Sequence, residues 1–148
     1  MYKHILVAID GSELSHRGLL QGIGLARTLG ARLDIVTVSE PWAMGMYDTM
    51  GWSVGYEASP EYREEREQAA QAVLAPALAE AQAAGVEAAS YHVLDRYAAE
   101  GILQVAEQCQ SDLLVMSSHG RRGMSRVLLG SQTLEVLSGT TIPMLVVR

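Results

Sequence analysis

The sequence predicts a single α/β domain in which helices cover both faces of an open parallel sheet. Three observations lead to this prediction. Strand-like apolar segments alternate with segments of helical period along the whole chain. The strand-like segments are mostly continuous apolar runs, which suits strands that are buried on both faces of a parallel sheet. The length of 148 residues fits one domain, spanning 1–148, whose core needs no disulfides.

Five segments have the composition of strands. Four are short and rich in β-branched residues or leucine, and the third along the chain is longer and more mixed. They are HILVAI at 4–9, LDIVTV at 33–38, VEAASYHVL at 86–94, LLVM at 113–116 and IPMLVV at 142–147.

Capping residues mark the first two expected helices. The first helix begins at about Ser12, a residue type that caps helix N-termini, and ends at Gly30, which suits the left-handed position after a helix. The second begins with Ser59-Pro60, a capping residue followed by a proline at the first helical position. It is expected to end at Gly85.

The remaining helical segments complete the alternation. The third helix is expected over about 97–109 and the fourth over about 131–138, ending before Gly139. Pro76, inside the second helix, is expected to kink it because proline removes a hydrogen-bond donor and clashes with the preceding turn. The order βαβαβαβαβ implies right-handed crossovers and helices on both faces of the sheet.

The segment 40–59 interrupts this regularity. It runs for about twenty residues without clear periodicity, a length at which loops are often lids or binding loops. It contains both tryptophans of the chain, together with tyrosines, methionines and glycines. The alternative is a cover packed over the apolar end of the second helix, and the sequence leaves both interpretations open.

Composition argues against several classes of protein. The formal net charge of −6 and the pI of about 5.1 argue against sequence-independent nucleic-acid binding. The single cysteine, Cys109, forms no internal disulfide and is interpreted as a core residue. The N-terminus lacks the features of a signal peptide, and no apolar run approaches the roughly 18 residues of a membrane span. We therefore expect a soluble, cytoplasmic protein with no membrane span.

Two loops at the carboxyl ends of expected strands carry the candidate chemistry, because open parallel sheets bind ligands at that edge. In the first, AIDGSELS, the carboxylate of Asp10 suits a ribose, a base or a metal, or else it caps the following helix. The chain has no GxGxxG pattern and no Walker lysine motif. Their absence disfavours a dinucleotide dehydrogenase and a P-loop NTPase.

The second loop, SSHGRRGMSRVLLGSQT, has the features of an anion site. Its glycines let backbone amides approach a ligand, and Gly130-Ser131 directly precedes a helix whose free N–H groups favour anions. His119 is interpreted as ordering this loop. The loop contains no acidic residue and three arginines, each of which by itself suits a solvated loop tip: Arg121, Arg122 and Arg126. The combination of these features predicts a phosphate site.

The chain resembles the universal stress protein family in ILVAIDGSELS at the start, MSSHGRRGMSRVLLGS in the second loop and IPMLVVR at the end. The resemblance covers essentially the whole chain. ATP-binding members of the family carry G-x-x-G, nine residues, and then glycine followed by serine or threonine. Here Gly120, nine intervening residues and Gly130-Ser131 match this pattern, whereas Ser117 replaces the first glycine. In this spacing the chain is similar to the ATP-binding members.

The resemblance implies a Rossmann-like, five-stranded sheet in the order 3-2-1-4-5, with ATP and Mg²⁺ between strands one and four. It further implies a regulatory role in the stress response without robust catalysis, a homodimer through the last strand and an unidentified protein partner. By position, the implied nucleotide-binding residues are Ala8, Asp10, Val38, Met116, Ser117, Gly120, Gly130, Ser131 and Gln132. Asp10 and Val38 would flank the nucleoside, and the residues from Gly120 onward would contact the phosphates.

Two other functions remain open. A slow ATP hydrolase or phosphotransferase would need a base or a metal-binding carboxylate near the γ-phosphate, and Asp10 is the only nearby candidate. A nucleotide-independent dimeric interaction module would use the segment 40–59 as an apolar patch. The histidines have no metal-ligand spacing among themselves or with Cys109, so the sequence predicts neither a metal site built from protein ligands nor a catalytic residue.

Overall fold

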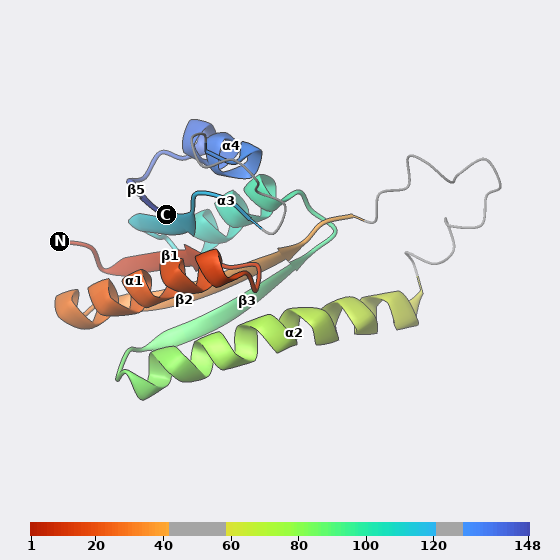
Figure 1. The fold of residues 1–148 in the computed structure, drawn as a ribbon, viewed down its shortest axis with the longest axis horizontal. Helices are drawn as coiled ribbons and strands as arrows, with labels where there is room; N and C mark the ends of the chain where they lie inside the picture. The colour runs from red at the N-terminus through yellow and green to blue at the C-terminus, as the bar shows by residue number, and fades with distance from the viewer. Residues whose placement is uncertain (42–58, 121–128) are drawn as a thin grey trace.

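The computed structural model describes residues 1–41, 59–120 and 129–148 (Figure 1). Within these ranges strands and helices alternate as the sequence predicts. The elements are β1 (His4–Ala8), α1 (Glu13–Leu29), β2 (Arg32–Ser39), α2 (Pro60–Ala83), β3 (Ala88–Leu94), α3 (Ala98–Gln108), β4 (Leu113–Ser117), α4 (Ser131–Gly139) and β5 (Met144–Val147).

The five strands form one parallel sheet in the order β3-β2-β1-β4-β5, which confirms the expected order. Ile5 of β1 is in register with Leu33 of β2 on one side and Leu113 of β4 on the other. Because all strands run the same way, their carboxyl ends meet at one edge of the sheet. The strand order reverses between β1 and β4, and a crevice forms at such a point.

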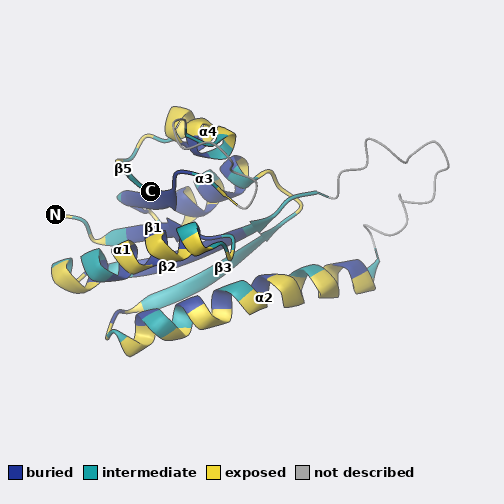
Figure 2. Ribbon diagram, viewed as in Figure 1, coloured by how far each residue is buried: buried dark blue, intermediate teal, exposed yellow. Residues whose placement is uncertain are grey.

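Helices cover both faces of the sheet, with α1 and α2 on one side and α3 and α4 on the other (Figure 1). Alternate residues of β1 enter the two resulting cores. Ile5 and Val7 pack in a cluster with residues of α1 and α2, whereas Leu6 and Ala8 pack in a second cluster with residues of α3 and α4. Figure 2 shows that the buried residues concentrate in the central strands, while β3 at the sheet edge is only partly buried.

The helix ends bear out the capping signals. Ser12 Oγ accepts a hydrogen bond from the Ser15 N–H at 3.1 Å, and Gly30 takes the left-handed conformation after α1 with φ 63°. Ser59 caps α2 in the same way. Pro76 lies inside α2, which is one continuous helix from end to end. The cap at Ser12 fixes the start of α1 at the carboxyl edge of the sheet.

The observed end of α4 differs from the end that the sequence predicts. The sequence predicts an end before Gly139, but the helix continues through this glycine. A Cβ at Gly139 would lie 2.8 Å from Leu103 Cδ1 of α3. The glycine therefore permits close packing of α4 on α3 and does not end the helix. No helix in the described ranges is long and apolar enough to cross a membrane.

Candidate functional site

A cleft of about 600 Å³ opens at the carboxyl edge of the sheet, where β1 and β4 diverge. Its walls come from the ends of β1, β2 and β4, the first turns of α3 and α4, and one side of α2. Every site residue named from the sequence lines this one cleft: Ala8, Asp10, Val38, Met116, Ser117, Gly120, Gly130, Ser131 and Gln132.

Asp10 organises the turn between β1 and α1. Its Oδ1 accepts a hydrogen bond from the Ser12 N–H at 2.9 Å, and its own N–H donates to Ser15 Oγ at 3.3 Å. The carboxylate therefore takes part in capping α1, one of the two roles that the sequence left open. A Cβ at Gly120 would lie 2.9 Å from Asp10 Oδ2, so this glycine lets the loop after β4 approach the Asp10 carboxylate.

The two ends of the loop after β4 meet at Ser118. Gly130 donates its N–H to the Ser118 carbonyl at 2.7 Å, and Ser118 Oγ lies 3.1 Å from His119 Nδ1. Ser117 Oγ donates to the His119 carbonyl at 2.9 Å. These bonds agree with the interpretation of His119 as a residue that orders the loop.

Gly130 has a packing reason to lack a side chain. A Cβ there would lie 3.2 Å from the Ser118 carbonyl oxygen and 3.5 Å from His119 Cα. The sequence explained this glycine by the close approach of a ligand. In the structure, the glycine also lets the two ends of its own loop come together.

The N-terminus of α4 opens into the cleft without a cap. Gly130 is the N-cap residue and offers no side chain, and the first turn holds no acidic residue. The first N–H groups of a helix have no partner within the helix, and the helix dipole adds partial positive charge there. Because Gly130, Ser131 and Gln132 all line the cleft, this end of α4 provides an anion-binding position.

Two side chains of the first turn of α4 make contacts that sequence reasoning missed. Gln132 Oε1 accepts a hydrogen bond from the Ala99 N–H at 3.0 Å, which caps α3 because Tyr97 makes no side-chain cap. Thr133 Oγ1 lies 3.1 Å from the carbonyls of both Ser117 and Ser118. Thr133 is buried. Its polar side chain at an inward-facing helical position is the signal in the sequence that could have indicated these contacts.

The other end of the cleft is mainly apolar. Ala8 and Met116 are almost fully buried there, and the Val38 side chain packs on α3, where a Cβ at Gly101 would lie 2.8 Å from Val38 Cγ2. Val38 therefore lines the cleft while its side chain packs on α3. Such a surface suits a flat aromatic ring.

α2 forms a wall of the cleft that sequence reasoning did not include. Ala69, Ala70 and Val73 present small apolar side chains, and Arg66 adds a cation. The Arg66 guanidinium lies 5.2 Å from the centroid of the Tyr62 ring. The loop arginines lie within 121–128 and most of the segment 40–59 lies within 42–58, and both ranges are outside the described residues. The roles expected for them stay predictions.

A second polar cluster lies toward the amino end of β2. Asp34 is fully buried, its Oδ1 accepts from Arg32 at 3.1 Å, and Arg32 also donates to the Tyr91 hydroxyl at 3.1 Å. The Asp34 carboxylate raises the pKa of the Arg32 guanidinium. A hydrogen bond with the Cys109 thiol, followed by burial, raises the pKa of Tyr91 to about 12. We call these four residues the Asp34 cluster.

The model of the universal stress protein family matches residues 1–148. A universal stress protein of Thermus aquaticus is 34% identical over 148 residues, which span all of this chain and all of that protein. This chain therefore belongs to the universal stress protein family.

Two solved structures with the same fold contain nucleotides. The universal stress protein of Archaeoglobus fulgidus in complex with dAMP has a TM-score of 0.70 at 17% identity, covering 99% of this chain and 98% of that one. A universal stress protein in complex with cAMP has a TM-score of 0.68 at 23% identity, covering 99% of this chain and 97% of that one. At these identities the likeness establishes the shared fold.

Proposed function

We propose that this universal stress protein binds ATP in the cleft between β1 and β4 and acts as a nucleotide-dependent regulator in the cytoplasm. The observation that carries the proposal is the uncapped N-terminus of α4 facing a cleft of about 600 Å³. The complexes of two structural relatives with dAMP and cAMP support an adenine nucleotide as the ligand class.

The two ends of the cleft suit the two ends of a nucleotide. The adenine would lie at the apolar end, between Ala8 and the backbone of Val38, and the ribose beside Met116 and Ser117. The phosphates would accept hydrogen bonds from the first N–H groups of α4, where negative charge is favoured.

Mg²⁺ would accompany the triphosphate. This ion keeps several waters and usually takes one or two carboxylates together with phosphate oxygens. Asp10 and Glu40 are the carboxylates that line the described part of the cleft. The described residues contain no cluster of three or more metal-ligating side chains, so we propose that phosphate and water would supply most of the ligands.

Regulation would operate through the shape of the nucleotide-bound protein. A nucleotide shifts a conformational balance only by binding one conformation better than another, and a protein partner would respond to that shift. β5 lies at the sheet edge and is partly exposed along its whole length, which supports the proposed homodimer through this strand.

The variant Ser131→Glu tests the anion position directly. It places a carboxylate at the first residue of α4, where a negative charge favours the helix but repels a phosphate. We expect wild-type protein to bind ATP in isothermal titration calorimetry, and the variant to bind at least about 10-fold more weakly, a change of about 1.4 kcal/mol. Its thermal unfolding should be unchanged or slightly improved.

Ser138→Glu is the matched control, because it adds the same charge to an exposed position at the other end of α4. It should bind ATP like the wild type. Absence of ATP binding by the wild type, together with absence of co-purified nucleotide in native mass spectra, would refute the proposal. Equal affinity of Ser131→Glu and wild type would refute the phosphate position.

A further inference from the structure

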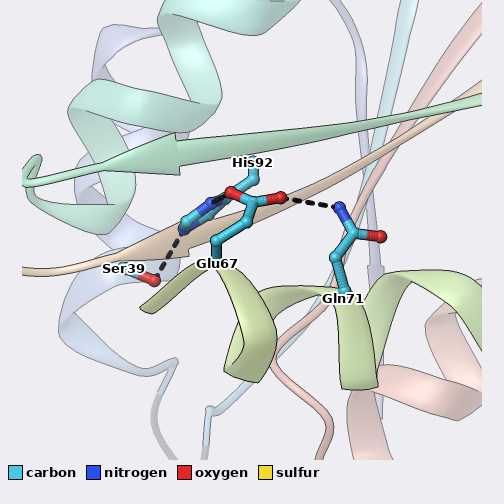
Figure 3. Close-up of polar contacts among 4 residues, drawn as sticks. All are labelled: Ser39, Glu67, Gln71 and His92. Carbon is cyan, nitrogen blue, oxygen red and sulfur yellow. Dashed lines mark hydrogen bonds and ion pairs between the residues drawn. The ribbon is translucent and has the colours of Figure 1, made fainter. Parts of the chain in front are cut away.

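Four side chains, of which Ser39 lines the cleft, form a continuous chain of hydrogen bonds that nucleotide binding does not require (Figure 3). Ser39 Oγ at the end of β2 lies 2.8 Å from His92 Nε2 of β3. His92 Nδ1 lies 2.6 Å from Glu67 Oε2 of α2. Gln71 Nε2 donates to the other oxygen of Glu67 at 2.8 Å. Three elements that are separate in the sequence therefore place a serine, an imidazole and a carboxylate in line.

The protons in this chain follow from the carboxylate. Hydrogen bonds from Gln71 and His92 lower the pKa of Glu67, so it is ionised and only accepts hydrogen bonds. In the neutral imidazole, His92 Nδ1 must then carry the hydrogen, and Nε2 is the acceptor. In that neutral form the Ser39 hydroxyl donates to His92 Nε2, which is the direction in which an imidazole removes the proton of a nucleophilic serine.

Burial separates the base from water and leaves the serine beside the cavity. The His92 side chain is only 7% exposed, whereas that of Glu67 is 54% exposed. Ser39 lines the cleft. A small molecule that enters the cleft can therefore approach the hydroxyl, while the imidazole behind it is packed between α2 and the sheet.

A backbone donor lies next to the serine. The Ser39 carbonyl accepts a hydrogen bond from the Asp95 N–H at 2.8 Å. The N–H of Glu40 makes no hydrogen bond within the described part of the chain. In hydrolases with a nucleophilic serine, the N–H of the residue after the nucleophile stabilises the oxyanion that forms on the substrate. The Glu40 N–H is in the position along the chain for that role.

We propose that Ser39 is an activated nucleophile and that it takes the acyl group of small carboxylic esters that enter the cleft. His92 is the general base and Glu67 is a positioning residue that holds the imidazole. The small apolar side chains Ala69 and Ala70 on the α2 wall suit a short, uncharged acyl group. The activity does not require nucleotide, although an ester and a nucleotide would enter the same cleft.

The reaction balances with water as the only other reagent. Ser39 Oγ bonds to the carbonyl carbon, and its proton passes to His92 Nε2. The bond from that carbon to the alcohol oxygen then breaks, and the leaving alkoxide takes the proton from His92. Water, deprotonated by His92, attacks the acyl-serine, releases the carboxylic acid and restores the Ser39 hydroxyl.

A fluorophosphonate, which reacts with activated serines, tests the proposal without nucleotide. Attack by Ser39 would displace fluoride, and intact mass spectrometry should show one phosphonate adduct, mapped to Ser39 by peptide analysis. Ser39→Ala should lose the adduct, and His92→Gln should slow its formation by about 100-fold or more, the usual contribution of a general base. Ser138→Ala, at an exposed serine that donates to the Leu134 carbonyl, should react like wild type.

The positioning role of Glu67 has a separate readout. Glu67→Gln keeps a hydrogen-bond acceptor for His92 Nδ1 but removes the negative charge that stabilises the imidazolium form. The pH midpoint of fluorophosphonate labelling should therefore shift to lower pH, whereas Gln71→Ala should leave the midpoint close to that of wild type. An unchanged midpoint in Glu67→Gln would contradict its positioning role.

Ser39→Cys in a Cys109→Ser background guards against variants that simply unfold. A thiol beside the His92–Glu67 pair should ionise readily, so alkylation by iodoacetamide should reach half its maximal rate well below pH 8.5, the pKa of an ordinary cysteine. Absence of phosphonate labelling in folded wild-type protein would overturn the proposal. So would equal labelling of Ser39→Ala, or an alkylation profile like that of a free cysteine.

Discussion

The cleft and the Asp34 cluster use polar groups in opposite ways, although both include residues of β2. In the Asp34 cluster, the buried carboxylate of Asp34 is paired with Arg32, which also bonds to Tyr91. In the cleft, the N-terminus of α4 has no cap and faces an open cavity. Polar groups paired within the protein, such as Asp34 Oδ1 with Arg32, contribute to stability, whereas donors left toward a cavity are available to a ligand. Substitutions should therefore affect stability in the first region and binding in the second.

The largest effect is expected for Arg32→Met, which leaves the Asp34 carboxylate buried without its ion-pair partner. Removing the partner of a buried carboxylate is costly, but the Arg32 side chain is 38% exposed, so we expect a loss of about 2 kcal/mol in the free energy of unfolding. Urea denaturation followed by circular dichroism measures this loss. The double variant Arg32→Met/Asp34→Leu should recover part of it, and a single variant as stable as wild type would remove the contrast between the two regions.

A smaller loss is expected for Thr133→Val, which keeps the shape of the side chain but removes the hydroxyl that lies between the Ser117 and Ser118 carbonyls. The Ser118 carbonyl keeps the Gly130 N–H as a donor, so the variant leaves the Ser117 carbonyl without the Thr133 hydroxyl, at a cost of about 1 kcal/mol. Thr133→Ser is the control because it keeps the hydroxyl. If Thr133→Val unfolds at the same urea concentration as Thr133→Ser, the hydroxyl does not hold the cleft loop.

Gly130→Ala should affect both stability and binding. The added Cβ would lie 3.2 Å from the Ser118 carbonyl oxygen, so the loop must shift, at a cost of about 1 kcal/mol in stability. ATP affinity in calorimetry should fall as well, because the first N–H groups of α4 move. Gly24→Ala is the matched control, and it should raise the stability of the protein rather than lower it. No atom lies within 4 Å of its added Cβ, and alanine in a helix interior is favoured by about 0.5–1 kcal/mol.

The smallest effect is expected for His16→Gln on the surface. His16 Nε2 lies 2.9 Å from Glu80 Oε2, but both side chains are well exposed, and exposed ion pairs contribute at most about 1 kcal/mol. Thermal unfolding should change little, and high salt should remove any difference from wild type. A large, salt-resistant loss in His16→Gln would contradict this, because it would make the exposed pair as important as the Arg32–Asp34 pair.

The pH dependence of stability tests the contribution of Glu67, which bonds to His92. Its pKa is lowered in the folded protein, so the stability it contributes is present above the unfolded pKa of about 4.3 and is lost as pH falls through the folded value. Wild-type protein should therefore lose more stability than Glu67→Gln when the pH is lowered from 5 to 3. Parallel stability curves for the two proteins over this range would show that Glu67 makes no such contribution.

The sequence by itself determined the fold and the location of the cleft. Continuous apolar runs predict buried parallel strands, and Ser12 and Ser59 predict the starts of α1 and α2, because capping depends on residues only a few positions apart. The family pattern in the loop after β4 then named residues that all line one cleft. These signals are local or carried by a motif, so they can be read without the tertiary structure.

Only the tertiary structure decided which distant residues meet. The bond from Ala99 to Gln132 joins residues 33 positions apart, and the contacts of His92 reach Glu67 across 25 positions and Ser39 across 53. The wall formed by α2 and the loop contact that requires Gly130 belong to the same class. Such contacts depend on how helices pack on a twisted sheet, and no periodicity within one segment encodes that packing.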